Sequence, residues 1–259
     1  MKSGKIKLVA ILESHAPLAV ALSGGVDSAF LLAMAKQILG DQVIAMTSVS
    51  PLHARRDLAD AESIAASLSV PHVAVDTGPL EAPGFVLNTK NRCYICKRLL
   101  WKEFLNKAGE RGIDYVADGL CLDDLDEFRP GIAAGRELGI VSPLADAGLT
   151  KAEIRALSKT MGLFTWDKPS GTCLATRIPT GTPITRQRLA MIEQAETVLS
   201  GHGFRQCRVR LHGTTARIEV PSDDIEALMT PGTRQSVGAA LLKIGFTRVS
   251  ADLTGYGES

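Results

Sequence analysis

The chain has 259 residues, of which 45% are hydrophobic and 22% are charged. Its 29 basic and 28 acidic residues give a net charge of +1, so the whole molecule has no strong attraction to nucleic acid or to anionic membranes. The composition is ordinary for a globular protein and excludes a largely disordered chain, and the length allows one large core or two modest ones.

The N-terminal segment is basic, with Lys2, Lys5 and Lys7, but the apolar run after it is short and ends at Glu13. We therefore expect neither a signal peptide nor a membrane-spanning helix, and we expect a cytoplasmic protein. In such a protein, five cysteines are better interpreted as reactive or metal-binding groups than as disulfides.

The next sixty residues alternate between short apolar runs and amphipathic runs, at the spacing of βαβ units. We predict strands at 18–22, 43–49 and 72–76, with helices at 28–39 and 55–68 between them. Strands connected in this way form a parallel sheet, and such sheets bind ligands at the carboxyl ends of their strands. The first strand therefore leads into a predicted binding site at residue 23.

The turn after this strand reads Ser23-Gly24-Gly25-Val26-Asp27-Ser28. A glycine pair lets backbone N–H groups crowd around an anion, and the hydroxyls and the start of the next helix add to the attraction. No Gly-Lys-Ser/Thr sequence follows and no lysine is available to reach a γ-phosphate, which excludes a Walker A loop. The turn resembles the signature of the PP-loop ATP pyrophosphatases, which split ATP between its α and β phosphates. A plain helix-capping turn is the alternative.

The alternation then continues, with helices predicted at 93–108, 130–138 and 150–161 and strands at 113–117 and 140–141. The last of these helices opens with a capping box formed by Thr150 and Glu153. Loops are predicted at 78–92 and at 166–173, where proline and glycine interrupt the pattern.

The pattern changes near residue 180. A long helix at 184–199 precedes strands at 208–211 and 216–220, which read as a hairpin, and a further helix and a strand at 248–252 complete a small unit. We therefore predict an α/β protein with a parallel-sheet, adenine nucleotide α-hydrolase-like (PP-loop) domain at 1–180. A small α+β domain at 181–259 would serve substrate binding and oligomerisation.

The cysteines allow several kinds of site. Cys93 and Cys96 have metal-ligand spacing on one helical turn, and Cys173 lies in a distant loop that contains glycine. Three thiolates can hold a [4Fe-4S] cluster with one iron open to a further ligand. A zinc site would need a fourth ligand such as Cys121, Cys207 or a histidine. A redox-active pair and plainly buried cysteines are also compatible with this pattern.

Several segments closely resemble the LarE family of ATP-dependent sacrificial sulfur transferases. In chain order they are Arg92-Cys93-Tyr94-Ile95-Cys96-Lys97, Asp124 to Gly131, Ser142-Pro143-Leu144, Trp166-Asp167-Lys168-Pro169-Ser170 and Cys173-Leu174-Ala175-Thr176-Arg177-Ile178-Pro179. The similarity implies a pyridinium dicarboxylate mononucleotide as substrate. Its carboxylates would be adenylated and converted to thiocarboxylates, toward the nickel-pincer nucleotide cofactor of lactate racemase.

The resemblance also implies roles for individual residues. Ser23, Gly24, Gly25 and Ser28 would hold the pyrophosphate of ATP, while Asp27 would face Mg²⁺ or the backbone of the turn. Gly119, at the end of its strand, would allow the nucleotide to approach closely.

Cys173 occupies the position of the family's sulfur-donating cysteine, and its thiolate would attack the acyl adenylate and expel AMP. In the sacrificial route, loss of its Cα proton and cleavage of its C–S bond leave dehydroalanine. Members that also carry the Cys93 and Cys96 pair are understood to bind a [4Fe-4S] cluster whose extra sulfide is transferred instead. The three-cysteine pattern favours this catalytic route here.

Arg177, Arg208 and Arg210 are candidate ligands for the phosphate and carboxylates of the substrate, because arginine binds both groups bidentately. Arg208 and Arg210 share one strand face, an arrangement that solvated arginines would also have, and Glu219 could pair with them. The end of the chain, 255–259, lacks the arginine-containing tail of many relatives.

The main alternative function is that of a PP-loop tRNA-thiolating enzyme, which should carry an RNA-binding module or a broad basic face. No such module is recognisable, so we expect no nucleic acid partner and no membrane partner. Amidating enzymes and a non-catalytic nucleotide sensor fit less well. The family resemblance implies a homo-oligomer.

Overall fold

The computed structural model describes residues 2–125, 130–169 and 171–256, with the side chains of residues 2 and 3 not described. The predicted roles and motifs at 126–129, 170 and 257–259 therefore lie outside the described residues. The chain divides into two compact units: unit 1 is Met1–Phe85 with Asn91–Gly171, and unit 2 is Val86–Lys90 with Thr172–Ser259.

This division differs from the predicted ranges 1–180 and 181–259, since the segments 86–90 and 172–180 belong to unit 2. Hydrogen bonds explain the difference. The side-chain amide of Asn88 donates to the carbonyls of Pro179 and Thr182, each at 2.8 Å, and the Asn88 carbonyl accepts from Gly181 N at 2.9 Å. The functions predicted for the two domains stay predictions.

Unit 1 is built on a four-stranded parallel sheet in the order β3-β2-β1-β4. The strands are β1 (Leu18–Ala21), β2 (Val43–Val49), β3 (His72–Asp76) and β4 (Tyr115–Ala117). The predicted strand at 140–141 is a single parallel bridge between Val141 and Ala117. The parallel-sheet α/β fold is confirmed.

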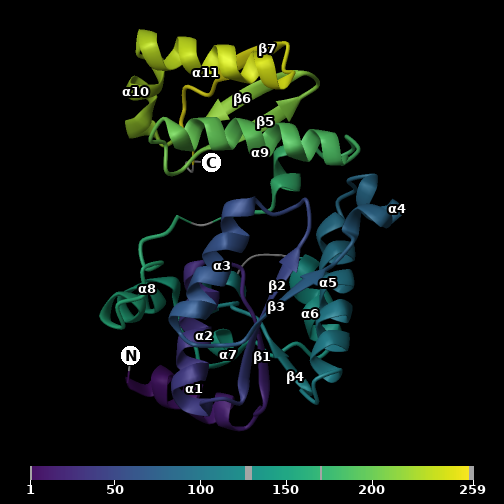
Figure 1. Cartoon of the computed structure of the whole chain (residues 1–259), viewed down its shortest axis with the longest axis vertical. Coiled ribbons are helices and arrows are strands. Elements are labelled where there is room, and N and C mark those ends of the chain that lie inside the picture. Colours follow the sequence, from purple (N-terminus) through teal and green to yellow (C-terminus); the bar gives the residue numbers. More distant parts are fainter. Residues whose placement is uncertain (1, 126–129, 170, 257–259) are drawn as a thin grey trace. The chain divides into compact units, whose positions relative to one another are not determined.

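Helices cover both faces of this sheet (Figure 1). One face carries α1 (Lys2–Glu13), α2 (Val26–Leu39), α3 (Arg55–Ser67) and α8 (Lys151–Thr160), and the other carries α5 (Arg92–Gly109) and α6 (Pro130–Glu137). Successive residues of β1 point to opposite faces, so Val20 joins the first core and Ala19 the second, with Met46, Trp101 and Phe104. β1 is therefore buried from both sides and fixes where its C-terminal turn lies.

Helix α1 was not predicted. Its apolar run is too short to suggest a helix by periodicity, but Leu8 and Leu12, four residues apart, are both fully buried in the core beside α2. The remaining short elements of unit 1 are η1 (Pro79–Glu81), η2 (Leu122–Leu125) and α7 (Pro143–Asp146), while α4 (Pro83–Val86) ends where unit 2 begins.

Unit 2 contains a three-stranded sheet in the order β5-β6-β7 with helices packed beside it. Its elements are η3 (Leu174–Arg177), α9 (Arg186–Gly201), β5 (Arg208–His212), β6 (Thr215–Glu219), η4 (Ser222–Asp224), α10 (Ile225–Met229), α11 (Pro231–Ile244) and β7 (Arg248–Ala251). The predicted hairpin is confirmed as the antiparallel pair β5 and β6, and β7 adds in parallel. None of the helices in the described ranges combines the length and apolar character needed to cross a bilayer.

The predicted capping box is present at the start of α8. Thr150 Oγ1 accepts from Glu153 N at 3.3 Å, and the Glu153 carboxylate accepts from Thr150 N at 3.1 Å. We expect Thr150→Ala to lower the free energy of unfolding by about 1 kcal/mol, because the N-terminal N–H groups lose their acceptor. Urea denaturation measures this. Thr160→Ala at the other end of the helix is the control, and an equal loss in both variants would contradict the capping role.

Candidate functional site

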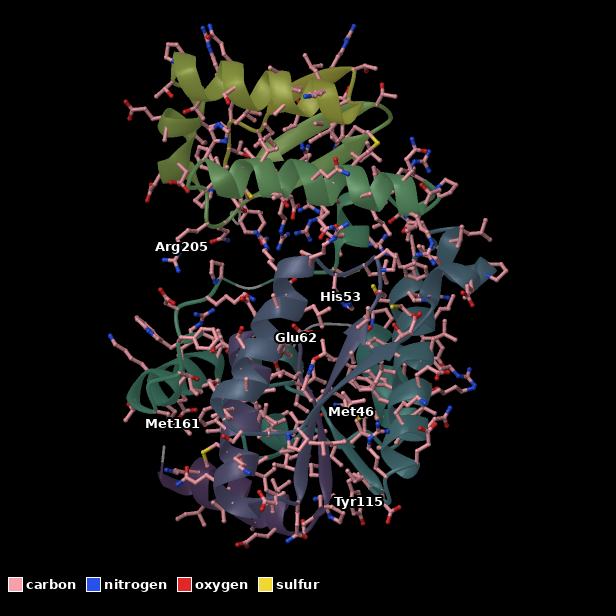
Figure 2. The ribbon with its side chains drawn as sticks, viewed as in Figure 1. Met46, His53, Glu62, Tyr115, Met161 and Arg205 are labelled. Atoms are coloured by element: carbon pink, nitrogen blue, oxygen red, sulfur yellow. The ribbon has the colours of Figure 1, made fainter. Side chains whose placement is uncertain are left out.

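The turn between β1 and α2 lies at the carboxyl edge of the sheet. Figure 2 locates this edge by His53, in the segment after β2, and the opposite edge by Tyr115 at the start of β4. Gly24 has a φ of +75°, and a Cβ there would meet the Asp57 carbonyl oxygen of α3 at 2.5 Å. Only glycine fits this position, as the sequence predicts for a phosphate-binding turn.

Two serines close the turn. Ser28 Oγ accepts a hydrogen bond from Ser23 N at 3.1 Å and lies 3.0 Å from Ser23 Oγ. Ser28 is buried, whereas Ser23 is exposed. Gly25 is the N-cap of α2 and provides no side-chain cap, so the first N–H groups of this helix are available to an anion.

Gly119 lies against the start of α2. A Cβ on it would approach Ser28 N at 2.9 Å and Ser28 Cα at 3.1 Å. The glycine therefore allows close packing of the loop after β4 onto the turn between β1 and α2. Direct contact of Gly119 with a nucleotide stays a prediction.

Asp27 is partly buried in the first turn of α2. Burial, and next the nearby Asp124 carboxylate, raise the pKa of Asp27, while Lys151 and Arg155 of α8 oppose the increase. No hydrogen bond to its carboxylate is found within the described residues, and these residues contain no group of three potential metal ligands. A role of Asp27 toward Mg²⁺ is therefore a prediction that rests on this one carboxylate.

Lys168 reaches the turn from a distant part of unit 1, a contact that the sequence did not predict. Its Nζ donates to the Gly24 carbonyl at 2.9 Å and to Asp60 of α3 at 2.5 Å, and it lies 3.3 Å from Asp57 Oδ1. Arg155 holds the same loop by donating to the carbonyls of Trp166 and Lys168, at 3.0 and 2.8 Å. The only sequence signal was the family-like motif around Lys168, because 144 residues separate it from Gly24.

The cysteine pair begins α5. Cys93 is exposed and Cys96 is partly exposed, and neither forms a disulfide. Cys121 and Cys207, considered as further zinc ligands, are buried in unit 1 and unit 2 respectively. Cys121 Sγ contacts Asp124 Oδ2 at 3.2 Å, and burial together with this carboxylate raises the pKa of the thiol to about 12. Neither buried thiol is placed as an accessible ligand.

Cys173 immediately precedes η3 and is partly exposed. Its carbonyl accepts three hydrogen bonds, from Thr176 N at 3.0 Å, from Thr176 Oγ1 at 2.8 Å and from Arg177 Nη1 at 3.2 Å. The same Arg177 nitrogen donates to the Thr172 carbonyl at 2.8 Å. The loop that carries Cys173 is therefore fixed by side chains of unit 2.

Arg177 is only 5% exposed and is paired with Glu196 of α9, with Nε 2.8 Å from Oε1. Its donors are thus engaged by Glu196 and by the loop around Cys173. Arg177 thus supports the loop around Cys173, and its predicted contact with the substrate stays a prediction. Burial was the missing information, since a loop arginine looks the same in sequence whether it faces solvent or the core.

The hairpin arginines differ from each other. Arg210 donates to Glu219 at 2.9 Å, the pairing that the sequence suggested, and to the Thr176 carbonyl at 2.9 Å. Arg208 lies over the Tyr256 ring, 4.0 Å from its centroid, and no described residue accepts a hydrogen bond from its guanidinium. Burial lowers the pKa of Arg208. Of the three predicted substrate arginines, Arg208 has the most available donors.

Comparison with known proteins adds several findings. The Asparagine synthase family matches residues 9–85. The uncharacterized protein slr1717 of Synechocystis sp. is 38% identical over 237 residues, which is 92% of this chain and 88% of that protein. The pyridinium-3,5-bisthiocarboxylic acid mononucleotide synthase of Lactiplantibacillus plantarum is 33% identical over 97% of this chain and 91% of the synthase. A tRNA-specific 2-thiouridylase of Rickettsia typhi is 27% identical over 60% of this chain and 53% of that enzyme.

Replacement of Asp27 tests its electrostatic environment. The pKa of Asp27 is higher in the folded state than in the unfolded chain, so its ionisation costs stability as the pH rises through the folded pKa. We expect Asp27→Asn to increase the free energy of unfolding at pH 7 and to lose this advantage below the unfolded pKa of about 3.9. Urea denaturation at several pH values measures it. The control is Asp41→Asn, since Lys36 lowers the pKa of Asp41, and a gain in both variants would contradict the electrostatic cause.

Glu196 tests the buried ion pair. We expect Glu196→Ala to lower the free energy of unfolding by about 3–5 kcal/mol, because the Arg177 charge stays buried without its partner. Alkylation of Cys173 should also become faster as its loop loses this support. The exposed Glu226 of α10 provides the control Glu226→Ala, with an expected change within about 0.5 kcal/mol. A loss of stability in Glu196→Ala no larger than in this control would contradict a stabilising pair between Glu196 and Arg177.

Proposed function

This chain belongs to the LarE family of PP-loop ATP pyrophosphatases, and from that premise we propose that it uses ATP to convert the carboxylates of a pyridinium dicarboxylate mononucleotide into thiocarboxylates. The observation that carries the proposal is the extent of the similarity. The relative named for the bisthiocarboxylate product matches 97% of this chain, and therefore both units, whereas the 2-thiouridylase matches 60%.

In the first step, the turn between β1 and α2 would bind the phosphates of ATP. The uncapped start of α2 and the exposed Ser23 provide donors for them. A substrate carboxylate oxygen attacks the α-phosphorus, the bond from this phosphorus to the bridging oxygen breaks, and pyrophosphate leaves. A Mg²⁺ ion, when bound, would neutralise charge on the phosphates, and the carboxylate of Asp27 would be its proposed ligand.

In the second step, sulfur replaces the adenylate. In the simplest route the Cys173 thiolate attacks the acyl carbon, AMP leaves and a thioester forms. Loss of the Cys173 Cα proton to solvent, with cleavage of the Cβ–S bond, then releases the thiocarboxylate and leaves dehydroalanine. Partial exposure of Cys173 in a fixed loop is compatible with this chemistry.

We favour a catalytic route over this single-turnover one, because the chain carries the cysteine pair of α5 in addition to Cys173. Two thiols one helical turn apart, neither in a disulfide, suit a cluster, and Cys93, Cys96 and Cys173 would be its ligands. A [4Fe-4S] cluster with one open iron would supply an extra sulfide for transfer, so that Cys173 would not be consumed.

Arg208 and Arg210 are the proposed ligands of the substrate's phosphate and carboxylates. They lie on β5, and Arg210 donates to the carbonyl of Thr176, three residues after Cys173. Arg208 offers its guanidinium for a bidentate contact. The homo-oligomer implied by the family stays a prediction.

The test is anaerobic reconstitution with iron and sulfide, followed by iron quantitation and a turnover assay with ATP and the pyridinium dicarboxylate nucleotide. The variants are Cys93→Ala and Cys173→Ala, with Cys207→Ala as the control for a buried cysteine outside the proposed ligand set. We expect a cluster in the wild type and the control, none in the other two variants, and more than one thiocarboxylate per wild-type chain.

Other outcomes have distinct meanings. A wild-type protein without a cluster that becomes lighter by one H₂S would establish the sacrificial route and overturn the cluster proposal. Sulfur transfer to unmodified tRNA, with no reaction of the pyridinium nucleotide, would establish the tRNA-thiolating alternative instead.

A further inference from the structure

We propose that Lys168 is a positioning residue for ATP: it fixes the orientation of the peptide between Gly24 and Gly25, so that the Gly25 N–H faces the phosphates. The proposal rests on ATP binding at this turn, as the proposed function requires. It assigns a role to the Trp166–Pro169 segment, which the sequence singles out only as part of a family resemblance.

Lys168 connects the turn to two helices of unit 1. Its Nζ bridges the Gly24 carbonyl, at 2.9 Å, and the side chain of Asp60 on α3, at 2.5 Å. The side chain is about one quarter exposed, and Arg155 holds the lysine's own carbonyl at 2.8 Å. Lys168 is therefore held by α3 through its ammonium group and by α8 through its backbone carbonyl.

The contact of Lys168 with the Gly24 carbonyl also determines the direction of the Gly25 N–H. In a planar trans peptide, the carbonyl of one residue and the N–H of the next point in opposite directions. Since Lys168 holds the Gly24 carbonyl toward α3, the Gly25 N–H points away from α3. It donates to Ser23 Oγ, 3.4 Å from Gly25 N, and Ser23 is exposed. A bound phosphate would accept from this N–H in place of the hydroxyl.

Without such a restraint, this peptide could rotate. Gly24 Cα cannot move toward α3, because it already packs against the Asp57 carbonyl, but a peptide between two glycines has few steric limits on rotation. A rotated peptide would present the Gly24 carbonyl oxygen to the phosphates and repel them. Lys168 removes this alternative by donating to the carbonyl oxygen.

Lys168 is poorly placed to act as a phosphate ligand itself. Asp57 and Asp60 both lie within ion-pair distance of Nζ, at 3.3 and 2.5 Å. Two carboxylates more than neutralise one ammonium group, so the lysine provides little net attraction for an anion. Its function is therefore that of a donor to the backbone, unlike the lysine of a Walker A loop.

The test compares Lys168→Met with Lys168→Arg, which retains a donor. Lys159→Met is the matched control, because Lys159 lies on the same α8–loop region, 4.4 Å from the Trp166 ring centroid, and touches no part of the turn. For each protein, calorimetry gives the affinities for ATP and for adenosine, and thermal unfolding gives the stability. The amide NMR signal of Gly25 without nucleotide reports the orientation of the peptide.

We expect Lys168→Met to bind ATP about tenfold more weakly, the loss of roughly one hydrogen bond to a charged group. Adenosine affinity should be unchanged, and the Gly25 signal should shift before nucleotide is added. Lys168→Arg should retain most of the ATP affinity, and Lys159→Met should match the wild type in every readout.

If the wild type binds ATP, three results would overturn this inference and leave the proposed function intact. They are equal ATP affinity of Lys168→Met and wild type, equal loss of ATP and adenosine affinity together with lower stability, and weaker ATP binding with an unshifted Gly25 signal. The last result would mean that Lys168 acts through its charge, on the phosphates or on Asp57 and Asp60, and not through the orientation of the peptide. A wild type that does not bind ATP would overturn the proposed function, and this inference with it.

Discussion

The approach of Gly24 to helix α3 is the constraint on which the proposed nucleotide site depends. At that point the chain leaves the most buried strand of the sheet with a positive φ, and the Asp57 carbonyl occupies the space that any side chain would need. Because the turn cannot relax toward α3, Ser23 and Gly25 are held on the opposite side, where Ser23 is exposed. Gly119 and Lys168 complete this arrangement from two other segments of unit 1.

A different interaction organises unit 2. The buried pair of Arg177 and Glu196 fixes the positions of the segments that it joins more than it adds net stability, since desolvation offsets much of the attraction between buried charges. Arg177 uses its remaining donors on the loop around Cys173, and Glu196 also accepts from Val209 N of β5 at 3.1 Å. One ion pair therefore connects the cysteine loop to the strand that carries Arg208, the proposed substrate ligand.

Much of the fold could be predicted because it depends on local sequence patterns. The βαβ alternation, the glycine turn, the capping box at Thr150 and the hairpin of unit 2 all depend on residues close together in sequence. The features that could not be predicted depend on contacts between distant residues. Lys168 contacts Gly24 across 144 positions, Arg177 is buried, and Asn88 bonds to a segment ninety residues later, which moves the unit boundary.

The carbonyl of Cys173 has a further chemical consequence. It accepts from a backbone N–H, a hydroxyl and a guanidinium, an arrangement that stabilises negative charge on its oxygen. Removal of the adjacent Cα proton would place an enolate charge on this oxygen. In the sacrificial route, the same three donors that give the loop its shape would therefore stabilise this charge and assist elimination at Cys173.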